Sequence, residues 1–251
     1  MFNMRKESGS MGVFKAAATV FAAAVASAAF ANDEKCPISE NVRGHENVEW
    51  SISYGYGLAD ASKELPRVLL VGDSICNAYQ NGVRDRLKGR MNVTFWVSSY
   101  CVTSPAYLPL LSVYLDEAKY DVVHFNNGLH TASQTAAGAY SKAYRAALEL
   151  IRRKQPQAKI VWCSCTPLSG AHCSAERVRK APELNAAVAK VAAEFGVDGT
   201  DDLFALCDPL DRKENWKDGF HFHGPAVEKQ ADQVAASVLA ALDLTSGRAS
   251  K

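Results

Sequence analysis

The chain has 251 residues, with 28 Lys and Arg against 27 Asp and Glu, which gives a formal net charge of +1 at pH 7. It has neither the basic stripe expected of a nucleic-acid-binding protein nor a polyacidic tail, so we expect no nucleic-acid partner. A chain of this length fits one domain with a core large enough to be stable without disulfides or a structural metal.

Residues 1–31 are expected to be a secretory signal peptide that is cleaved near Ala31. Three basic residues precede an uncharged, Ala-rich stretch at 16–31, which ends on the small-x-small sequence Ala29-Phe30-Ala31. The alternative is a membrane anchor, but this stretch is shorter and less apolar than the ~20 residues of a spanning helix. No Cys follows the cleavage site directly, so we expect no lipid-modified terminus. The protein is therefore expected to be secreted or periplasmic, without a stable membrane anchor.

Residues 67–245 are expected to form the main domain, after an irregular lead-in segment at 32–66. Helical spacing of apolar residues predicts helices around 140–151, 184–195 and 227–238, with Pro182 in the first turn of the second. Alternating β and α units predict a three-layer α/β/α sandwich around a parallel sheet of about five strands. Short continuous apolar runs predict strands buried on both faces at 67–72, 92–97, 121–125 and 159–163.

This architecture indicates where functional side chains should gather. In open parallel sheets, binding and catalytic sites form on the loops that follow the carboxyl ends of the strands. We therefore expect the site on loops at 72–77, 98–105, 126–133 and 164–174, and on the loop 218–225 before the last helix.

Ser74 follows the first strand in the sequence Gly72-Asp73-Ser74, where its hydroxyl would be exposed at a helix N-terminus. By itself this triplet favours a helix cap, formed by Ser74 or by Asp73. Asp218 and His221, however, lie three residues apart on the loop before the last helix. A nucleophilic Ser needs an imidazole to accept its proton and a carboxylate to orient that imidazole. Together the three residues predict a catalytic triad.

The two segments that carry these residues resemble the first and last signature blocks of the SGNH, or GDSL, hydrolases. The resemblance extends over roughly 67–242, with the blocks in the family's order and separation. It implies the flavodoxin-like SGNH hydrolase fold, a triad of Ser74, His221 and Asp218, and ester hydrolysis without a metal or other cofactor.

The middle blocks of the family match less closely. The stretch 126–131 (NNGLHT) stands where the family has Gly-x-Asn-Asp, and it resembles a subgroup with an FNxGLH sequence. Aligned on Gly128, His130 replaces the Asn that donates a hydrogen bond to the oxyanion, and Asn127 is the alternative donor. A third interpretation is that Asn126 and Asn127 only bridge backbone groups in the turn.

The second block normally supplies a Gly whose N–H completes the oxyanion hole, and the loop 98–105 has no Gly. A backbone N–H near Cys101 or Val102 is expected to take this place beside the N–H of Ser74. Tyr100 and His223 are expected to contact substrate.

A metal site is not expected. His221, His223 and Asp218 could outline one, but two His and one carboxylate make a thin ligand set. The group Arg177, Arg179 and Lys180 is interpreted as the solvated start of a helix.

Seven cysteines lie in the part of the chain that follows the signal peptide. In an oxidising compartment they are candidates for disulfides, and the odd number leaves at least one unpaired. Cys76 with Cys101 and Cys165 with Cys173 are possible pairs, but the sequence does not decide the connectivity. The seven are Cys36, Cys76, Cys101, Cys163, Cys165, Cys173 and Cys207.

These features predict a secreted serine esterase. The expected substrate is a small ester or an acylated glycan, and the most specific prediction is an O-acetylesterase that acts on carbohydrate. The alternatives are a short-chain lipase, lysophospholipase or thioesterase of the same fold, and a non-hydrolytic domain that binds glycan or transfers acyl groups.

Overall fold

The computed structural model describes residues 48–58, 65–128, 130, 135–170 and 173–246. The predicted signal peptide at 1–31 and most of the lead-in segment at 32–66 lie outside these residues. The chain divides into two units at residue 33, and everything described belongs to the second. Within this part of the chain, none of the helices is both long enough and apolar enough to cross a membrane.

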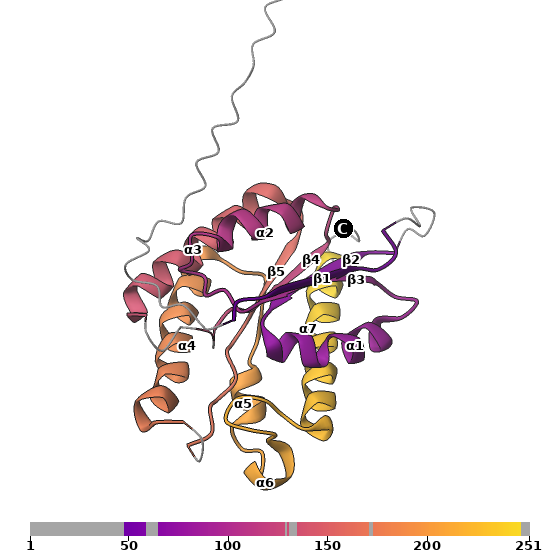
Figure 1. Cartoon of the computed structure of the whole chain (residues 1–251). Coiled ribbons are helices and arrows are strands. Elements are labelled where there is room, and N and C mark those ends of the chain that lie inside the picture. Colours follow the sequence, from indigo (N-terminus) through magenta and orange to yellow (C-terminus); the bar gives the residue numbers. More distant parts are fainter. Residues whose placement is uncertain (1–47, 59–64, 129, 131–134, 171–172, 247–251) are drawn as a thin grey trace, which may run out of the picture. The chain divides into compact units, whose positions relative to one another are not determined.

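A six-stranded sheet forms the centre of the molecule, in the order β1-β3-β2-β4-β5-β6 (Figure 1). The five strands from β2 to β6 are parallel, which confirms the predicted parallel sheet, and only β1 runs antiparallel, at the edge beside β3. The strands are β1 (Ser51–Gly55), β2 (Arg67–Gly72), β3 (Asn92–Ser98), β4 (Val122–Phe125), β5 (Lys159–Cys163) and β6 (Gly199–Asp201).

Helices cover both faces of the sheet and complete the predicted three-layer sandwich (Figure 1). One face carries α1 (Ser74–Leu87) and α7 (Gly224–Ser246). The other carries α2 (Tyr107–Asp116), α3 (Ala137–Lys154) and α4 (Ala175–Phe195). The short helices α5 (Leu203–Cys207) and α6 (Arg212–Asn215) lie on the connection from β6 to α7.

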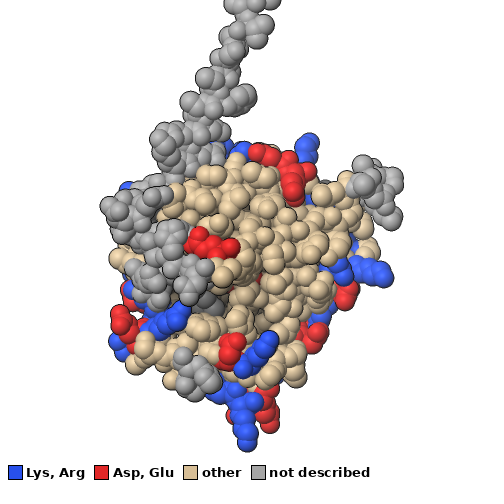
Figure 2. All heavy atoms as spheres, viewed as in Figure 1, with Lys and Arg blue, Asp and Glu red and all other residues tan. Residues whose placement is uncertain are grey.

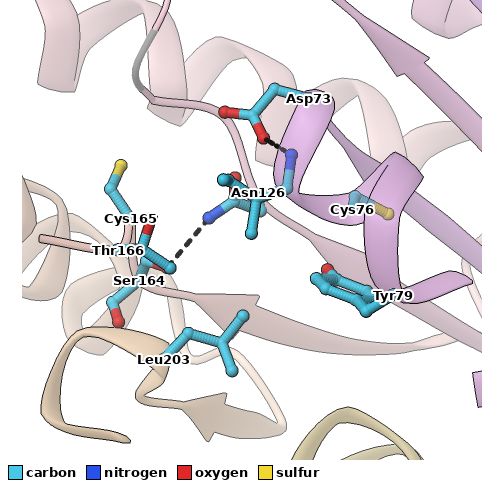
Figure 3. A pocket seen from close by; sticks show the side chains of 9 residues that line it. Asp73, Cys76, Tyr79, Asn126, Ser164, Cys165, Thr166 and Leu203 are labelled. Atoms are coloured by element: carbon cyan, nitrogen blue, oxygen red, sulfur yellow. Dashed lines mark hydrogen bonds between the residues drawn. The ribbon is translucent and has the colours of Figure 1, made fainter. Parts of the chain in front are cut away.

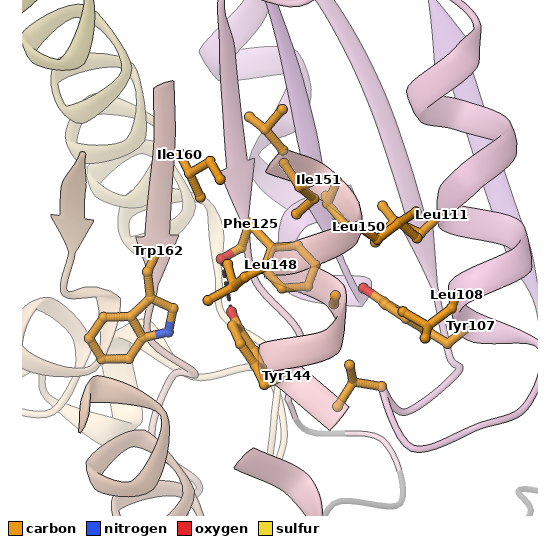
Figure 4. Packing of buried hydrophobic residues seen from close by; sticks show 14 of the residues in the cluster. Tyr107, Leu108, Leu111, Phe125, Tyr144, Leu148, Leu150, Ile151, Ile160 and Trp162 are labelled. Atoms are coloured by element: carbon orange, nitrogen blue, oxygen red, sulfur yellow. Dashed lines mark hydrogen bonds between the residues drawn. The ribbon is translucent and has the colours of Figure 1, made fainter. Parts of the chain in front are cut away.

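The apolar run of β2 is buried on both faces because its side chains alternate between the two helical layers. Val68 and Leu70 pack in the core under α1 and α7, whereas Leu69 and Val71 pack in the core under α2, α3 and α4. Figure 4 shows the second of these cores, with Tyr144 against Phe125 at a ring distance of 4.8 Å. The Tyr144 hydroxyl donates to the Phe125 carbonyl at 3.1 Å, so the buried phenol has a partner.

The helix α4 begins earlier than the sequence analysis predicts. Ser174 caps it by accepting the Arg177 N–H, and Pro182 lies inside the helix rather than in its first turn. A proline inside a helix removes one backbone hydrogen bond, which is why the prediction placed Pro182 in the first turn. The prediction did not consider Ser174 as the cap of an earlier start. The helix ends at Gly196, whose φ of 76° is the left-handed conformation that favours glycine.

The register of the strands brings the predicted site loops to one edge of the sheet. Gly72 of β2 lies opposite Val97 of β3, and Val71 lies opposite Phe125 of β4. The loops that follow these three strands therefore start side by side.

On the face seen in Figure 2, basic and acidic side chains are interspersed, without a surface of one sign.

Candidate active site

Ser74 is the first residue of α1. From the sequence either Ser74 or Asp73 could cap this helix, and in the structure Asp73 does so. The carboxylate of Asp73 accepts the Ile75 N–H at 2.9 Å, so Asp73 is the N-cap. The Ser74 hydroxyl lies 2.9 Å from Nε2 of His221, 147 residues further along the chain. The Ser74 hydroxyl is not the helix cap, and it is hydrogen-bonded to an imidazole nitrogen, so this nitrogen can accept its proton.

His221 is oriented by Asp218 from the same loop. Nδ1 of His221 lies 2.8 Å from Oδ2 of Asp218, while Oδ1 accepts the backbone N–H groups of Phe220 at 2.7 Å and His221 at 2.8 Å. Since the carboxylate can only accept, Nδ1 carries the proton and Nε2 is free to accept from Ser74. The structure therefore brings the three predicted triad residues into one chain of hydrogen bonds.

The carboxylate of Asp218 is held in its ionised form. Partial burial acts to raise its pKa, but the hydrogen bonds from the His221 ring and from two backbone N–H groups outweigh burial and lower the pKa to about 2. The side chains of His221 and Asp218 are 39% and 45% exposed, so the chain of hydrogen bonds is open to an incoming substrate.

The loop that carries Asp218 and His221 is fixed by main-chain hydrogen bonds on both sides. The Lys217 N–H donates to the His221 carbonyl at 2.9 Å, and the Ser169 N–H donates to the Gly219 carbonyl at 3.0 Å. At its base the rings of Trp216 and Phe222 pack at 4.5 Å. These contacts fix the position of the His221 imidazole relative to α1, which carries Ser74.

Asn127 connects two of the predicted site loops. Its Oδ1 accepts the Val102 N–H at 2.8 Å, and its Nδ2 donates to the Tyr100 carbonyl at 2.9 Å. The Val102 N–H is thus engaged and cannot serve an oxyanion, which leaves the N–H of Cys101 as the main-chain candidate from this loop. Nδ2 of Asn127 carries a second hydrogen, but the side chain also interacts with the buried Tyr107 hydroxyl, whose pKa it lowers against the larger effect of burial.

Asn126 bridges backbone groups, as one of the interpretations of this turn predicted. Its Nδ2 donates to the carbonyls of Cys163 and Ser164, both at 3.0 Å. It thereby joins the loop after β4 to the loop after β5.

The remaining predicted site residues surround this centre in different ways. His130 packs edge-on against Trp50, with the ring centroids 5.8 Å apart and the planes at 85°. Tyr100 is half-buried, and its carbonyl is engaged by Asn127. His223 is exposed at the start of α7, and its N–H donates to the Asn215 carbonyl at 2.8 Å. Leu129 and residues 131–134 of the third block lie outside the described residues.

A small cavity lies close to Ser74, which is not itself among the lining residues, and leaves about 10 Å³ for the centre of a water-sized molecule (Figure 3). Its lining includes both chain neighbours of Ser74 and the polar side chains that follow β4 and β5. Tyr79 and Leu203 also line it. Tyr79 is a candidate from the sequence because it is an aromatic residue near the site, although such residues belong more often to the core; nothing in the sequence pattern indicates Leu203. The lining residues are Asp73, Ile75, Cys76, Tyr79, Asn126, Ser164, Cys165, Thr166 and Leu203.

A buried polar cluster that the sequence did not indicate lies between the sheet and α7. Nε2 of His124 meets Oδ2 of Asp201 at 2.8 Å, and Gln233 and Ser237 donate to the same carboxylate at 2.7 and 3.1 Å. Cys163 completes a group whose candidate ligand atoms lie within 4.8 Å of one another. The carboxylate already has three partners, so the cluster is best described as a buried structural pair of His124 and Asp201, in which Nδ1 of His124 makes no hydrogen bond within the described residues. A His inside one strand and an Asp at the end of another were the only signal for it.

The disulfides considered from the sequence do not form in this structure. All six cysteines that the structure describes are free thiols. Cys76 packs in the core under α1 and α7, whereas Cys101 packs in the core on the other face of the sheet, so the sheet separates them. The thiol of Cys165 points to the Asn127 carbonyl at 3.4 Å, and that of Cys173 points to the Gly219 carbonyl at 3.7 Å. Burial raises the pKa of Cys76 to about 12, which disfavours its thiolate.

Comparison with known proteins places this site in a family context. A model of the GDSL-like lipase/acylhydrolase family matches residues 51–225, which hold the whole hydrogen-bonded chain from Ser74 to His221. No match was found among curated proteins.

Several solved structures are similar in fold. A GDSL-like lipase from Bacteroides thetaiotaomicron is 16% identical, with a TM-score of 0.57 over 74% of this chain and 96% of that one. A carbohydrate esterase of family 3 from Talaromyces cellulolyticus is 14% identical, with a TM-score of 0.55 over 70% and 97%. A variant of an acetyl-xylooligosaccharide esterase from Geobacillus is 15% identical, with a TM-score of 0.55 over 69% and 94%.

Proposed function

Because this chain belongs to the GDSL-like lipase/acylhydrolase family, and is a serine hydrolase that acts on ester bonds, we propose that it removes O-acetyl groups from carbohydrate. The observation that carries the proposal is the continuous hydrogen-bonded chain from the Ser74 hydroxyl through His221 to Asp218. Ser74 is proposed as the nucleophile, His221 as the general base and acid, and Asp218 as the residue that orients His221.

The proposed reaction has two steps. Nε2 of His221 takes the proton of Ser74 as its oxygen attacks the acetyl carbonyl, and His221 then gives that proton to the leaving sugar hydroxyl. A water molecule, deprotonated by the same nitrogen, cleaves the acetyl-enzyme and releases acetate. Asp218 stabilises the imidazolium in both steps because its own pKa of about 2 keeps it ionised throughout.

The oxyanion is proposed to be held by the backbone N–H groups of Ser74 and Cys101 and by a side chain from the loop after β4. For that side chain, His130 is favoured by its alignment with the third block of the family, and the second amide hydrogen of Asn127 is the alternative. The bridge that Asn127 makes supports an indirect part as well, because it sets the height of the Tyr100–Val102 segment beside Ser74.

Two observations support a short acyl group. The cavity lined by Asp73 and Ile75, the chain neighbours of Ser74, leaves only about 10 Å³ for the centre of a water-sized molecule, far below the ~300–1,000 Å³ of pockets that take drug-sized ligands. Two of the proteins with similar folds are named as esterases of carbohydrate or acetylated oligosaccharide. An acetyl group is the acyl group that fits both.

Export is part of the proposal. The basic start, the Ala-rich stretch at 16–31 and the Ala29-Phe30-Ala31 end support a signal peptide cleaved near Ala31. Acetylated polysaccharides of the cell exterior would then be the accessible substrates, in the medium or the periplasm. N-terminal sequencing of the protein recovered outside the cytoplasm tests this part, and an intact Met1 there would contradict it.

The central experiment measures acetate release from a panel of acetylated glycans by wild type and Ser74→Ala, alongside labelling by a serine-directed phosphonate. Wild type should release acetate and take up one label, and Ser74→Ala should do neither. A Ser74→Ala protein that labels as well as wild type would overturn the assignment of the nucleophile. Labelling of wild type without release from any glycan would instead point to glycan binding or acyl transfer.

A series of aryl esters with increasing acyl length separates the proposal from its enzymatic alternatives. A sharp preference for acetyl is expected, because longer acyl chains exceed the space beside Ser74. Activity that rises with chain length would favour a lipase, lysophospholipase or thioesterase and would overturn the acetylesterase proposal.

A further inference from the structure

Arg177 places a positive charge beside the candidate active site. It lies in the first turn of α4, and its guanidinium carbon is 4.8 Å from the centre of the Phe220 ring. Phe220 directly precedes His221, and their rings meet edge to face with centroids 6.3 Å apart. The charge therefore stands one aromatic ring away from the imidazole that serves Ser74.

This charge has no carboxylate partner within the described part of the chain. The oxygens of Asp218, the acid of the same loop, are engaged by His221 and the Phe220 N–H. Lys180, one turn further along α4, differs in this respect because it pairs with Glu183 at 3.0 Å. Glu176 precedes Arg177 but is exposed and forms no ion pair with it. An arginine left unpaired beside a reaction centre is available to a charged ligand.

The side-chain N–H donors of Arg177 make no hydrogen bond within the described part of the chain. The contact with the Phe220 ring is an attraction between the charge and the ring face, and it does not use these donors. The ring beneath it is held in turn, because the Phe220 N–H donates to Asp218 and the preceding Gly219 carbonyl accepts the Ser169 N–H. Arg177 is thus half-buried and supported before any ligand arrives, which lowers the entropy cost of binding one.

We infer that Arg177 binds a carboxylate of the substrate, so that the acetylated glycan is an acidic one with a uronic-acid-type sugar at or next to the acetylated residue. This inference rests on the proposed function and names its substrate class. The planar fork of an arginine matches the two oxygens of a carboxylate and binds them with two parallel hydrogen bonds. From the sequence alone, Arg177 belongs to a solvated helix start. Its burial and its contact with Phe220 distinguish it from the exposed Arg179.

The test compares two forms of one substrate, an O-acetylated methyl glucuronoside and its uncharged carboxamide, with acetate release as the readout. Wild type should prefer the carboxylate by about tenfold to a hundredfold in kcat/KM, mainly through KM, as expected for charge-assisted hydrogen bonds. In Arg177→Ala this preference should fall to about one. Arg179→Ala is the matched control, since it removes an exposed arginine two residues away, and it should keep the preference.

Two results would overturn the inference. The first is a wild type that hydrolyses both forms equally well. The second is an Arg177→Ala protein that is slower on both forms but keeps the preference, because Arg177 would then act only by positioning Phe220 and the His221 loop.

A second readout separates failure of this inference from failure of the proposed function. Unacetylated methyl glucuronoside should slow phosphonate labelling of Ser74 in wild type and not in Arg177→Ala. If neither acetylated form releases acetate but this protection is seen, the acetylesterase proposal fails and the carboxylate site stands. If acetate is released from both forms and protection is absent, the proposed function stands and the carboxylate site is wrong.

Discussion

The side chain of Asn127 uses both ends of its amide to hold two loops together beside Ser74. It accepts from the Val102 N–H and donates to the Tyr100 carbonyl, and its own carbonyl accepts the Tyr140 hydroxyl. An Asp or Leu of similar size could not do this, because one lacks the donor and the other lacks both groups. The segment that contains Cys101 is therefore positioned by a residue outside it.

We predict that Asn127→Ala lowers kcat about a hundredfold, comparable to the loss of one oxyanion donor. Asn127→Asp should lower it at least as much, because it keeps the acceptor for Val102 but loses the donor to Tyr100 and adds a negative charge beside the oxyanion. Steady-state kinetics with an aryl acetate measures both. If Asn127→Ala retained kcat within about twofold of wild type, neither the bridge nor the second amide hydrogen would matter for turnover.

For single residues, the sequence could identify those whose side-chain chemistry reveals their role. It could not identify residues whose role depends on where the fold places them. Ser74, Asp218 and His221 could be predicted because a hydroxyl, a carboxylate and an imidazole are a set with a known use. The roles of Asn127 and Arg177 depend on which loop lies against which, and residue type and spacing do not carry that information. Choosing between Asp73 and Ser74 as the cap likewise needed the hydrogen bond to Ile75.

Between β2 and α1 the chain turns so tightly that Gly72 touches the first turn of the helix. The structure shows a steric reason for a glycine at this position. A Cβ on Gly72 would lie 2.4 Å from Cβ and 3.2 Å from Sγ of Cys76. The helix can start directly under the strand, with Ser74 at its tip, only because this position has no side chain.

We predict that Gly72→Ala lowers the free energy of unfolding by about 1–3 kcal/mol, the usual cost of overpacking. Its kcat should fall as well, because the clash is relieved by moving the turn that carries Ser74. Urea unfolding and aryl acetate kinetics measure the two effects. Gly138→Ala is the control, since a Cβ there meets nothing within 4 Å, and it should unfold within about 1 kcal/mol of wild type. A Gly72→Ala protein as stable as this control would contradict the steric argument.

The elements that sequence could predict are those with their own hydrophobic pattern. The apolar runs at 67–72, 92–97, 121–125 and 159–163 all became central strands, because burial on both faces demands continuous apolar residues. The strands β1 (SISYG) and β6 (GTD) have no such run. They join the sheet through main-chain hydrogen bonds to β3 and β5, which no side-chain pattern records.

Across the whole molecule, the buried pair of His124 and Asp201 links the sheet to α7. Burial acts to raise the pKa of Asp201, but its hydrogen bonds with His124, Gln233 and Ser237 outweigh this and lower it. A carboxyl whose pKa is lower in the folded than in the unfolded chain adds stability above the unfolded pKa of about 3.9. That stability is lost as the pH falls below this value.

We predict that wild type loses stability steeply below about pH 4, and that Asp201→Asn is less stable at pH 7 by about 3–5 kcal/mol because it leaves one partner of a buried pair. The variant should also show a shallower loss between pH 4 and pH 3. Urea unfolding at a series of pH values measures this. Asp116→Asn, which removes an exposed pair with Lys154, should change stability by less than about 1 kcal/mol. Parallel pH profiles for wild type and Asp201→Asn would count against the role of the pair.

During folding of this chain, burial of the free thiols competes with their oxidation to disulfides. Five of the six described cysteines are buried and unbonded once the protein is folded, but every one is exposed in the unfolded chain. A parallel sheet forms slowly, because its strands are joined across long connections. In an oxidising medium, thiols that are exposed in the unfolded chain form disulfides with one another before the core forms and buries them. Refolding yield should therefore rise with added reductant and fall with added oxidant, whereas the folded protein should tolerate either.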